Sequence, residues 1–275
     1  MSQTFANLQK MLPQHLLSRA IGKFAASESP FISRLFISQF ARTYGVSLDE
    51  AEEQSLQSYG SFNAFFTRSL QPGVRPMPAS PNAVASPADG VVSQVGKIDH
   101  DQLLQAKGHR YALHSLAGAA SSGFLDGDFI TIYLAPSDYH RVHLPFAGTL
   151  QQTIAIPGAL FSVNGSTERA IGGLFCRNER LVCRFSTDLG PMLVVLVGAM
   201  IVASIETVWN GPASPYRAEQ TTSYDLSLAR GDEIGRFLLG STVICCFPPG
   251  AMKLDSELQP GSTIRVGQTL GNIEG

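Results

Sequence analysis

A run of apolar, largely aliphatic residues in the second half of the chain limits the fold more than any other feature. The run extends from Met192 to Ala203, after Gly190-Pro191 and shortly before Glu206. A helix of 12 residues is too short to cross a bilayer, and this Val/Ile/Leu-rich composition is typical of strands that are buried on both faces. Such strands need a covering layer on each side, so the sequence predicts two packed layers rather than a sheet with one wet face.

Further short β-rich runs, separated by Gly, Pro, Asp and Asn, occur throughout residues 83–275. We therefore expect this part of the chain to be mainly β. The predicted strands are Val91-Val92, Phe129 to Leu134, Arg180 to Phe185, Met192 to Val208, and Val243 to Phe247.

The N-terminal quarter has helical periodicity instead. A first amphipathic helix is predicted from residues at helical spacing, and a second begins with Ser29 as N-cap and Pro30 at its first position. Ser47 to Glu50 has the form of a capping box, and Ser61 is expected to cap a short Phe-rich helix that ends at Pro72-Gly73. The apolar residues of the first helix are Leu12, Leu16, Leu17, Ala20, Ile21 and Phe24.

These helices are rich in Phe, Leu and positive charge. Residues 1–45 hold five Lys or Arg residues against the single acid Glu28. Such helices suit the interfacial plane of an anionic membrane, although they can equally pack on the β region or on a partner subunit. A linker over residues 71–82, rich in Pro and small residues, divides the chain into a helical region, 1–75, and a β region, 76–275. The basic residues are Lys10, Arg19, Lys23, Arg34 and Arg42.

Composition narrows the class of protein. The 275 residues are 44% hydrophobic and 15% charged, with a formal net charge of −2. These values exclude general disorder and imply no basic face for nucleic acid. No targeting segment is visible at the N-terminus. The four cysteines lack paired CxxC spacing, so we expect reduced, buried thiols of a cytoplasmic protein and no metal site: Cys176, Cys183, Cys245 and Cys246.

Three segments of the β region carry candidate chemistry. Ser86 to Gly90 contains an Asp-Gly pair, which is ordinarily a turn. The segment Asp138 to Pro145 contains His140 and His143, which a helix would place on one face and a strand on opposite faces. Taken alone, this His-x-x-His pair suits a structural, metal-binding or catalytic role, and no third metal ligand of matching type is apparent.

The third segment is Gly240-Ser241, immediately before the last predicted strand. A Gly-Ser pair usually marks a bend, but a serine can also attack the carbonyl of a preceding glycine, which has no Cβ to obstruct the strained geometry. Serine needs a general base, and the base needs an orienting carboxylate. Asp89, His143 and Ser241 supply these groups in an order that a serine hydrolase also uses, but no Gly-x-Ser-x-Gly elbow accompanies them.

Several motifs in a fixed order resemble the proteobacterial, pyruvoyl-dependent family of phosphatidylserine decarboxylases. The resemblance runs over nearly the whole chain, and the number and order of the motifs make it specific. They are Phe65-Phe66-Thr67-Arg68 with Pro72-Gly73, Ser86-Pro87-Ala88-Asp89-Gly90, Tyr139-His140-Arg141-Val142-His143, Pro157 to Asn164, Arg177-Asn178-Glu179-Arg180, Ile205 to Trp209, and Leu239-Gly240-Ser241-Thr242.

The resemblance implies an α+β fold, with N-terminal amphipathic helices packed on a mainly antiparallel, β-sandwich-like catalytic domain. It implies that His143, oriented by Asp89, deprotonates Ser241, whose Oγ attacks the Gly240 carbonyl and cuts the chain autocatalytically. The products are a β chain, 1–240, and an α chain, 241–275, which begins with a pyruvoyl group derived from Ser241. Neither a metal nor pyridoxal phosphate is expected.

The implied activity is that of a carboxy-lyase in phospholipid biosynthesis. The pyruvoyl carbonyl forms a Schiff base with phosphatidylserine, CO₂ departs, and phosphatidylethanolamine is released. His140 is expected to donate a proton or orient the substrate, although the two histidines can exchange roles. Phe161 and Ser162 are expected to contact the substrate.

The resemblance also implies a peripheral protein on the cytoplasmic side of the inner membrane, bound to an anionic surface and organised as a homodimer in the manner of its family. Two other functions stay open on the sequence. A pyruvoyl decarboxylase acting on a soluble amino acid would share the self-cleavage without needing the cationic helices. A non-enzymatic lipid-binding β module would remain a single intact chain.

Overall fold

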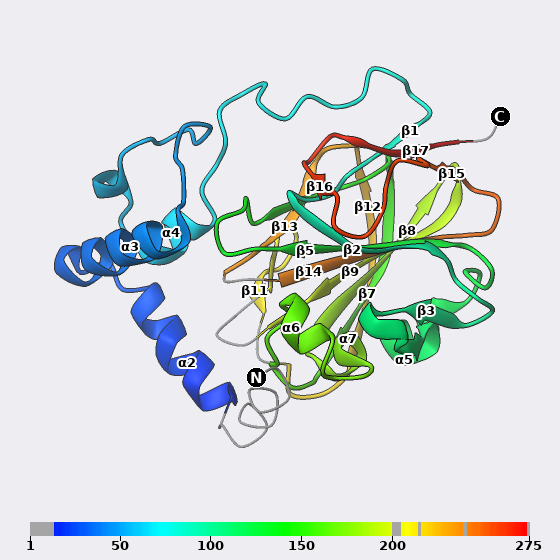
Figure 1. Cartoon of the computed structure of the whole chain (residues 1–275), viewed down its shortest axis with the longest axis horizontal. Coiled ribbons are helices and arrows are strands. Elements are labelled where there is room, and N and C mark those ends of the chain that lie inside the picture. Colours follow the sequence, from blue (N-terminus) through cyan, green and yellow to red (C-terminus); the bar gives the residue numbers. More distant parts are fainter. Residues whose placement is uncertain (1–13, 200–204, 214–215, 239–240, 274–275) are drawn as a thin grey trace.

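The computed structural model describes residues 14–199, 205–213, 216–238 and 241–273. Lys10, Leu12, the end of the apolar run from Met200 to Ala203, and Gly240 lie outside the described residues. Helices α2 to α4 stand to one side of a larger β domain (Figure 1). The expected α+β fold, with N-terminal helices and antiparallel strands, is confirmed.

An eight-stranded antiparallel sheet forms the centre of the β domain, in the order β12-β7-β8-β9-β14-β5-β2-β16. Its apolar runs became strands as expected, because β-branched residues pack well on a pleated surface. The strands are β2 (Gly90–Lys97), β5 (Asp128–Leu134), β7 (Gly148–Ile156), β8 (Arg180–Thr187), β9 (Gly190–Val197), β12 (Gln220–Leu228), β14 (Ser241–Phe247) and β16 (Thr263–Ile264).

Smaller sheets complete the domain. A four-stranded sheet has the order β11-β10-β13-β6, a three-stranded sheet has the order β1-β17-β15, and β3 pairs with β4. Their bounds are β1 (Ala83–Ala85), β3 (Gln102–Leu104), β4 (Arg110–Ala112), β6 (Arg141–His143), β10 (Ile205–Thr207), β11 (Gly211–Ala213), β13 (Glu233–Phe237), β15 (Lys253–Leu254) and β17 (Thr269–Asn272).

Both faces of the central strands of the large sheet are buried, which explains the unbroken apolar runs. Along β14, Val243 and Cys245 belong to a core shared with Val142 and Phe237 of the four-stranded sheet. Ile244 points to the opposite face, into a second core that short helices cover. These elements are η2 (Ala106–Gly108), α5 (Leu113–Ala117), η3 (Gly118–Ser121), α6 (Gly165–Glu168) and α7 (Leu174–Arg177).

The N-terminal helices enclose a third, separate core. Helices α2 (Gln14–Ala25) and α3 (Pro30–Tyr44) form where two helices were predicted, with η1 (Leu56–Ser58) and α4 (Phe62–Phe66) after them. The Ser61 hydroxyl caps α4 by accepting from the amide of Ala64 at 3.2 Å. Clustered aromatic rings hold the layer together, since Phe62 lies 4.6 Å from Phe36 and 4.9 Å from Phe40 between ring centroids.

Two details of the helical prediction were wrong. No helix follows Ser47, whose hydroxyl accepts from the amide of Asp49 instead, while Glu50 is drawn away by ion pairs to Arg75 and Arg265. Helix α4 ends at Phe66 rather than at Pro72-Gly73, because Thr67 caps it and the chain then turns toward the β domain.

Candidate active site

Ser241 is the first residue of β14 and is completely buried. It pairs with Leu134 of β5, and its Oγ has no hydrogen-bond partner among the described residues. Because strand side chains alternate, Ser241 shares the face of Val243 and Cys245, which looks toward the four-stranded sheet. A buried hydroxyl without a partner is costly, so this position is one where a functional explanation is needed.

His140 lies in the turn between β5 and β6 and is also completely buried. Its Nδ1 is 2.8 Å from the Asp138 carbonyl, which can only accept, so Nδ1 carries the proton. Its Nε2 therefore presents a lone pair, and this atom has no partner in the described part of the chain. The centroid of the His140 ring lies 4.0 Å from that of the Phe66 ring. Burial lowers the pKa of His140 to about 3.

His143, at the end of β6, has both ring nitrogens occupied. Its Nδ1 donates to the Gly231 carbonyl at 2.8 Å, and its Nε2 accepts from the Tyr139 hydroxyl at 3.0 Å. Burial lowers the pKa of His143 and raises that of Tyr139 to about 12. Tyr139 therefore holds the lone pair that His143 would use as a general base.

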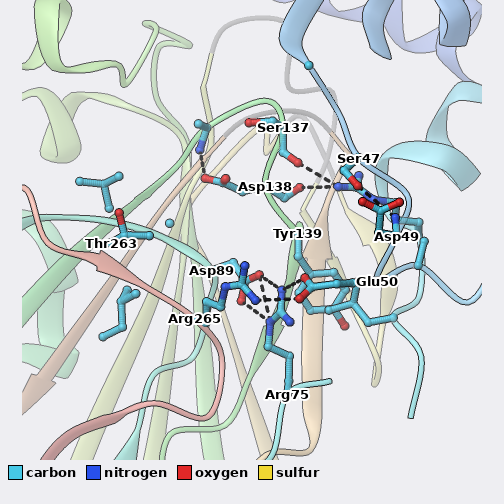
Figure 2. Close-up of a pocket in the computed structure, with 18 residues that line it drawn as sticks. Ser47, Asp49, Glu50, Arg75, Asp89, Ser137, Asp138, Tyr139, Thr263 and Arg265 are labelled. Atoms are coloured by element: carbon cyan, nitrogen blue, oxygen red, sulfur yellow. Dashed lines mark hydrogen bonds and ion pairs between the residues drawn. The ribbon is translucent and has the colours of Figure 1, made fainter. Parts of the chain in front are cut away.

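Asp89 immediately precedes β2 and is engaged by an arginine. Arg75 donates from Nε at 3.0 Å and from Nη2 at 2.5 Å, and the Val266 amide donates at 2.8 Å. Arg75 also binds Glu50 at 2.8 Å, and this hydrogen bond holds the pKa of Glu50 below its usual value. Figure 2 shows Asp89, Arg75 and Glu50 as one cluster, with Tyr139 beside it.

The structure gathers Asp89, His143 and Ser241 at one end of the two sheets. The His143 amide donates to the carbonyl of Pro87, two residues before Asp89, at 2.8 Å. Strand β2 pairs with β5, and β5 pairs with β14. Adjacent strands are about 4.8 Å apart, so Ser241 starts its strand roughly 10 Å from β2. Within the described ranges, no hydrogen bond joins the three side chains directly.

Phe161 and Ser162 lie in the loop after β7. The Phe161 amide and carbonyl both bond to the side chain of Asn178, at 3.1 and 2.8 Å. The Phe161 ring belongs to the core on the face of β14 opposite to the Ser241 side chain, and Ser162 is half-buried. Their role as substrate contacts stays a prediction.

Sequence reasoning did not find Arg75 or Tyr139 as site residues. Tyr139 adjoins His140 in a quoted motif, and an aromatic hydroxyl four residues before His143 is the signal that could have pointed to it. Arg75 lies in the Pro-rich linker, where an isolated arginine gives no sign of its partner. Only the fold brings it to Asp89.

Comparisons with known proteins agree with the motif pattern. A family model described as "Phosphatidylserine decarboxylase" matches residues 62–272, and a second, described as "PSD", matches residues 4–45. A phosphatidylserine decarboxylase proenzyme of Alcanivorax borkumensis is 51% identical over 97% of this chain and 95% of its own. Similar proenzymes of Ectopseudomonas mendocina (49%; 97% and 96% covered) and Psychrobacter arcticus (51%; 98% and 99%) also match.

These similarities place the chain among the decarboxylases, which are lyases. The chain belongs to the phosphatidylserine decarboxylase family. The family resemblance and enzyme class predicted from the motifs are thereby confirmed. In the part of the chain that the structure describes, no group of three or more His, Cys, Asp or Glu side chains is arranged to hold a metal ion.

The buried, neutral His140 predicts a pH dependence of stability. The unfolded chain takes up a proton near pH 6.5, whereas the folded chain does so only near pH 3, so the free energy of unfolding should fall as pH decreases through this window. The contribution is about 2 kcal/mol between pH 7 and pH 5. Urea unfolding of a Ser241→Ala chain, with and without His140→Asn, measures it.

The informative quantity is how the difference between the two proteins changes with pH. His143 is present in both, so its own titration should largely cancel, and a constant packing cost of the substitution does not matter. The His140→Asn chain should lose less stability on acidification. A pH-independent difference between pH 7 and pH 5 would contradict the burial of a neutral ring.

Proposed function

We propose that this chain is a phosphatidylserine decarboxylase proenzyme that cuts itself between Gly240 and Ser241 and carries a pyruvoyl group at the new terminus. One observation carries the proposal: the hydroxyl of Ser241 is buried at the start of a central strand and has no hydrogen-bond partner among the described residues. Its relatives are named proenzymes, which supports a zymogen. Ser241 follows a glycine, so the preceding carbonyl is open to attack.

The self-cleavage needs a base for the Ser241 hydroxyl. We assign this role to His143, oriented by Asp89. Tyr139 must first leave the Nε2 lone pair of His143, and the Nδ1–H of His143 must turn from the Gly231 carbonyl to Asp89. The Asp89 carboxylate has room for this N–H beside its three present donors. The Ser241 oxygen then attacks the Gly240 carbonyl to form an ester. Loss of the Ser241 α-proton breaks that ester, releases Gly240 as a carboxylate and leaves a dehydroalanine at residue 241. Its imine tautomer is hydrolysed by water, which supplies the keto oxygen as ammonia departs.

The unpartnered hydroxyl fits a position that becomes a prosthetic group, because chemistry there breaks no existing side-chain hydrogen bond. A pyruvoyl group supplies a carbonyl that condenses with the substrate amine and accepts the electron pair left by CO₂. We assign His140 to proton transfer in that reaction. In the precursor its Nε2 is a lone pair, and an anionic substrate nearby would raise its pKa and favour the protonated form.

Replacing Ser241 by alanine should leave one uncut, inactive chain of 29.5 kDa, because no oxygen remains to attack. Mass spectrometry of the unaltered protein should give fragments 1–240 and 241–275, the latter sensitive to borohydride or hydroxylamine. Thr242→Val is the matched control, since the next hydroxyl is equally buried and unpartnered. An uncut chain from an active preparation, or phosphonate labelling of an intact Ser241, would instead support a serine hydrolase.

Substitutions of the two histidines should affect different steps, self-cleavage for His143 and decarboxylation for His140. His143→Asn should slow self-cleavage by about 100-fold or more, the usual contribution of a general base. His140→Asn should still be cut but should lose decarboxylation by a similar factor. Gel analysis of cleavage over time and CO₂ release from the processed fraction test the two steps separately. The opposite pattern would show that the roles are exchanged.

We also propose that the helical region, residues 1–75, docks on an anionic membrane surface while residues 76–275 form the decarboxylase domain. The separate aromatic core around Phe62 supports this division. The outer surface of α2 and α3 exposes Phe24 (59%), Phe31 (79%) and Leu35 (63%) beside the exposed cations Lys23, Arg34 and Arg42. In the described residues, no helix has the length and apolar character needed to span a bilayer.

This surface favours a peripheral position on the cytoplasmic face of the inner membrane, where a lipid substrate keeps its acyl chains in the bilayer. The substrate, the α and β chains from one precursor and a homodimer are the partners that we propose. A decarboxylase of soluble amino acids would have no use for such a surface, and membrane binding distinguishes the two.

Phe31→Ser combined with Leu35→Ser should reduce co-sedimentation with phosphatidylglycerol-containing vesicles by about tenfold or more, because two exposed apolar side chains are lost. Thermal stability should stay unchanged, since both side chains are already in water. Leu125→Ser, which alters an exposed leucine (54%) of the β domain, is the control. Equal vesicle binding by the double variant and the control would contradict docking through α2 and α3.

A further inference from the structure

A cavity of about 650 Å³ lies between the N-terminal layer and the end of the β domain where the site residues gather. Its volume is within the range of small-molecule sites. The chain around Glu50 forms one wall, and the first residues of β2, the turn after β5 and the segment Thr263 to Arg265 form the others (Figure 2). Asp89, Asp138 and Tyr139 all line it.

Three arginines line this cavity, and two of them have carboxylate partners. Arg75 is paired with Asp89 and Glu50, and Arg265 is paired with Glu50. The third, Arg68, makes no ion pair within the described residues. It is therefore the cation of the cavity whose charge is not already balanced by a direct contact.

Arg68 is also deeply buried, with 6% of its surface exposed. Its Nη2 donates to the carbonyls of Ser137 and Asp138, at 2.9 and 3.3 Å, and the guanidinium lies 5.7 Å from the Phe65 ring centroid. Its Nη1 is buried and has no hydrogen-bond partner in the described ranges. Burial lowers the pKa of Arg68, as expected for a cation removed from water without a counter-ion.

A purely structural role explains the hydrogen bonds of Arg68 Nη2 but not the burial of Nη1. The two bonds from Nη2 tie α4 to the turn that carries Tyr139 and His140, but they leave the Nη1 donors unused. A guanidinium presents its donors in a planar fork that matches the two oxygens of a carboxylate or a phosphate. The unused donors of Arg68 therefore suit an anion with two oxygens.

The position of Arg68 connects this cavity to the reaction. Arg68 and His140 donate to the same carbonyl, that of Asp138, and Ala135 of the cavity wall directly follows Leu134, the strand partner of Ser241. An anion held at Arg68 is thus close to both residues. The carboxylates of the cavity, Asp138 and Asp89, suit the ammonium that accompanies the anions of a serine phospholipid.

We propose that Arg68 binds an anionic oxygen of the phospholipid head group, the phosphodiester or the serine carboxylate, and so positions the substrate amine toward residue 241. This inference rests on the proposed function for the identity of the substrate. The anion site itself stands on the burial and free donors of Arg68.

Binding to an uncut Ser241→Ala chain tests the site without requiring catalysis. Calorimetry with dihexanoyl phosphatidylserine should show that Arg68→Gln weakens binding by about tenfold or more, the usual effect of losing a charged hydrogen bond. Arg68→Lys should lose less. The matched control is Arg184→Gln, because Arg184 also donates to two carbonyls and lies over a phenylalanine ring, but on the far side of the sheet.

Two further ligands identify which anion is bound. If Arg68 holds the phosphodiester, dihexanoyl phosphatidylethanolamine and the methyl ester of the serine lipid should lose affinity in Arg68→Gln to the same degree. If it holds the carboxylate, only the free serine lipid should be affected. Either result supports the site, whereas affinities within twofold of the parent for all three lipids would overturn it.

A second measurement covers the case in which the variants fold poorly. In the Ser241→Ala chain with Arg68 intact, the guanidinium N–H signal of Arg68, assigned by its absence in Arg68→Lys, should shift on saturation with the serine lipid. An unchanged signal at saturation contradicts the proposal. If the natural chain does not cut itself but still binds the serine lipid in a way that depends on Arg68, the proposed function is rejected. The anion site is then still supported.

In the processed enzyme, Arg68→Lys should raise KM for the serine lipid by about tenfold with a smaller change in kcat, because the contact holds the substrate and does not transfer protons. A substitution that merely loosened the turn around His140 would lower kcat instead. That outcome would assign Arg68 a structural role only.

Discussion

The double-sided pairing of β14 is the constraint on which the site depends. Strand β5 bonds one edge of β14 and β9 bonds the other, while separate apolar cores cover its two faces. The register with Leu134 fixes Ser241 at the end of β5 from which the histidine turn departs. One strand pair thereby sets Ser241, the proposed nucleophile, relative to both histidines, and Ser241 and His140 are completely buried.

The uncut chain holds its reactive groups in pairs that are not the productive ones. Tyr139 occupies His143 and Arg75 occupies Asp89, while Ser241 and the Nε2 of His140 have no hydrogen-bond partner among the described residues. Burial of these polar groups is costly, and a folded protein tolerates the cost because the two cores around the sheet are large. Under the proposed mechanism, self-cleavage requires an exchange of the hydrogen bonds that His143 makes to Tyr139 and Gly231, with no change of fold.

The parts of the fold that follow from local sequence were predictable, and those that depend on contacts between distant segments were not. Strands β5, β9 and β14 are evident as apolar runs because both their faces are buried. Strand β12 is an edge strand with an exposed face. It has no continuous apolar run, because its exposed positions are polar, so it was not predicted. The motif residues Asp89, His140 and Ser241 could be chosen from the sequence, but the Arg75 contact to Asp89 and the isolation of Arg68 arise only when the linker and α4 meet the β domain. Glu50 was predicted to be part of a helix cap for the same reason, because its ion-pair partners, Arg75 and Arg265, are distant in the sequence.

The C-terminal segment beyond Ser241 contributes strands to two different sheets. Strand β14 lies between β5 and β9, β16 borders β2, and β17 lies between β1 and β15. A cut before Ser241 therefore produces two polypeptides that are interleaved and cannot separate without dismantling both sheets. Breaking that one peptide bond would turn the folding of a single chain into the assembly of two. The lifetime of a cleaved protein would then be set by how slowly it unfolds rather than by its ability to refold.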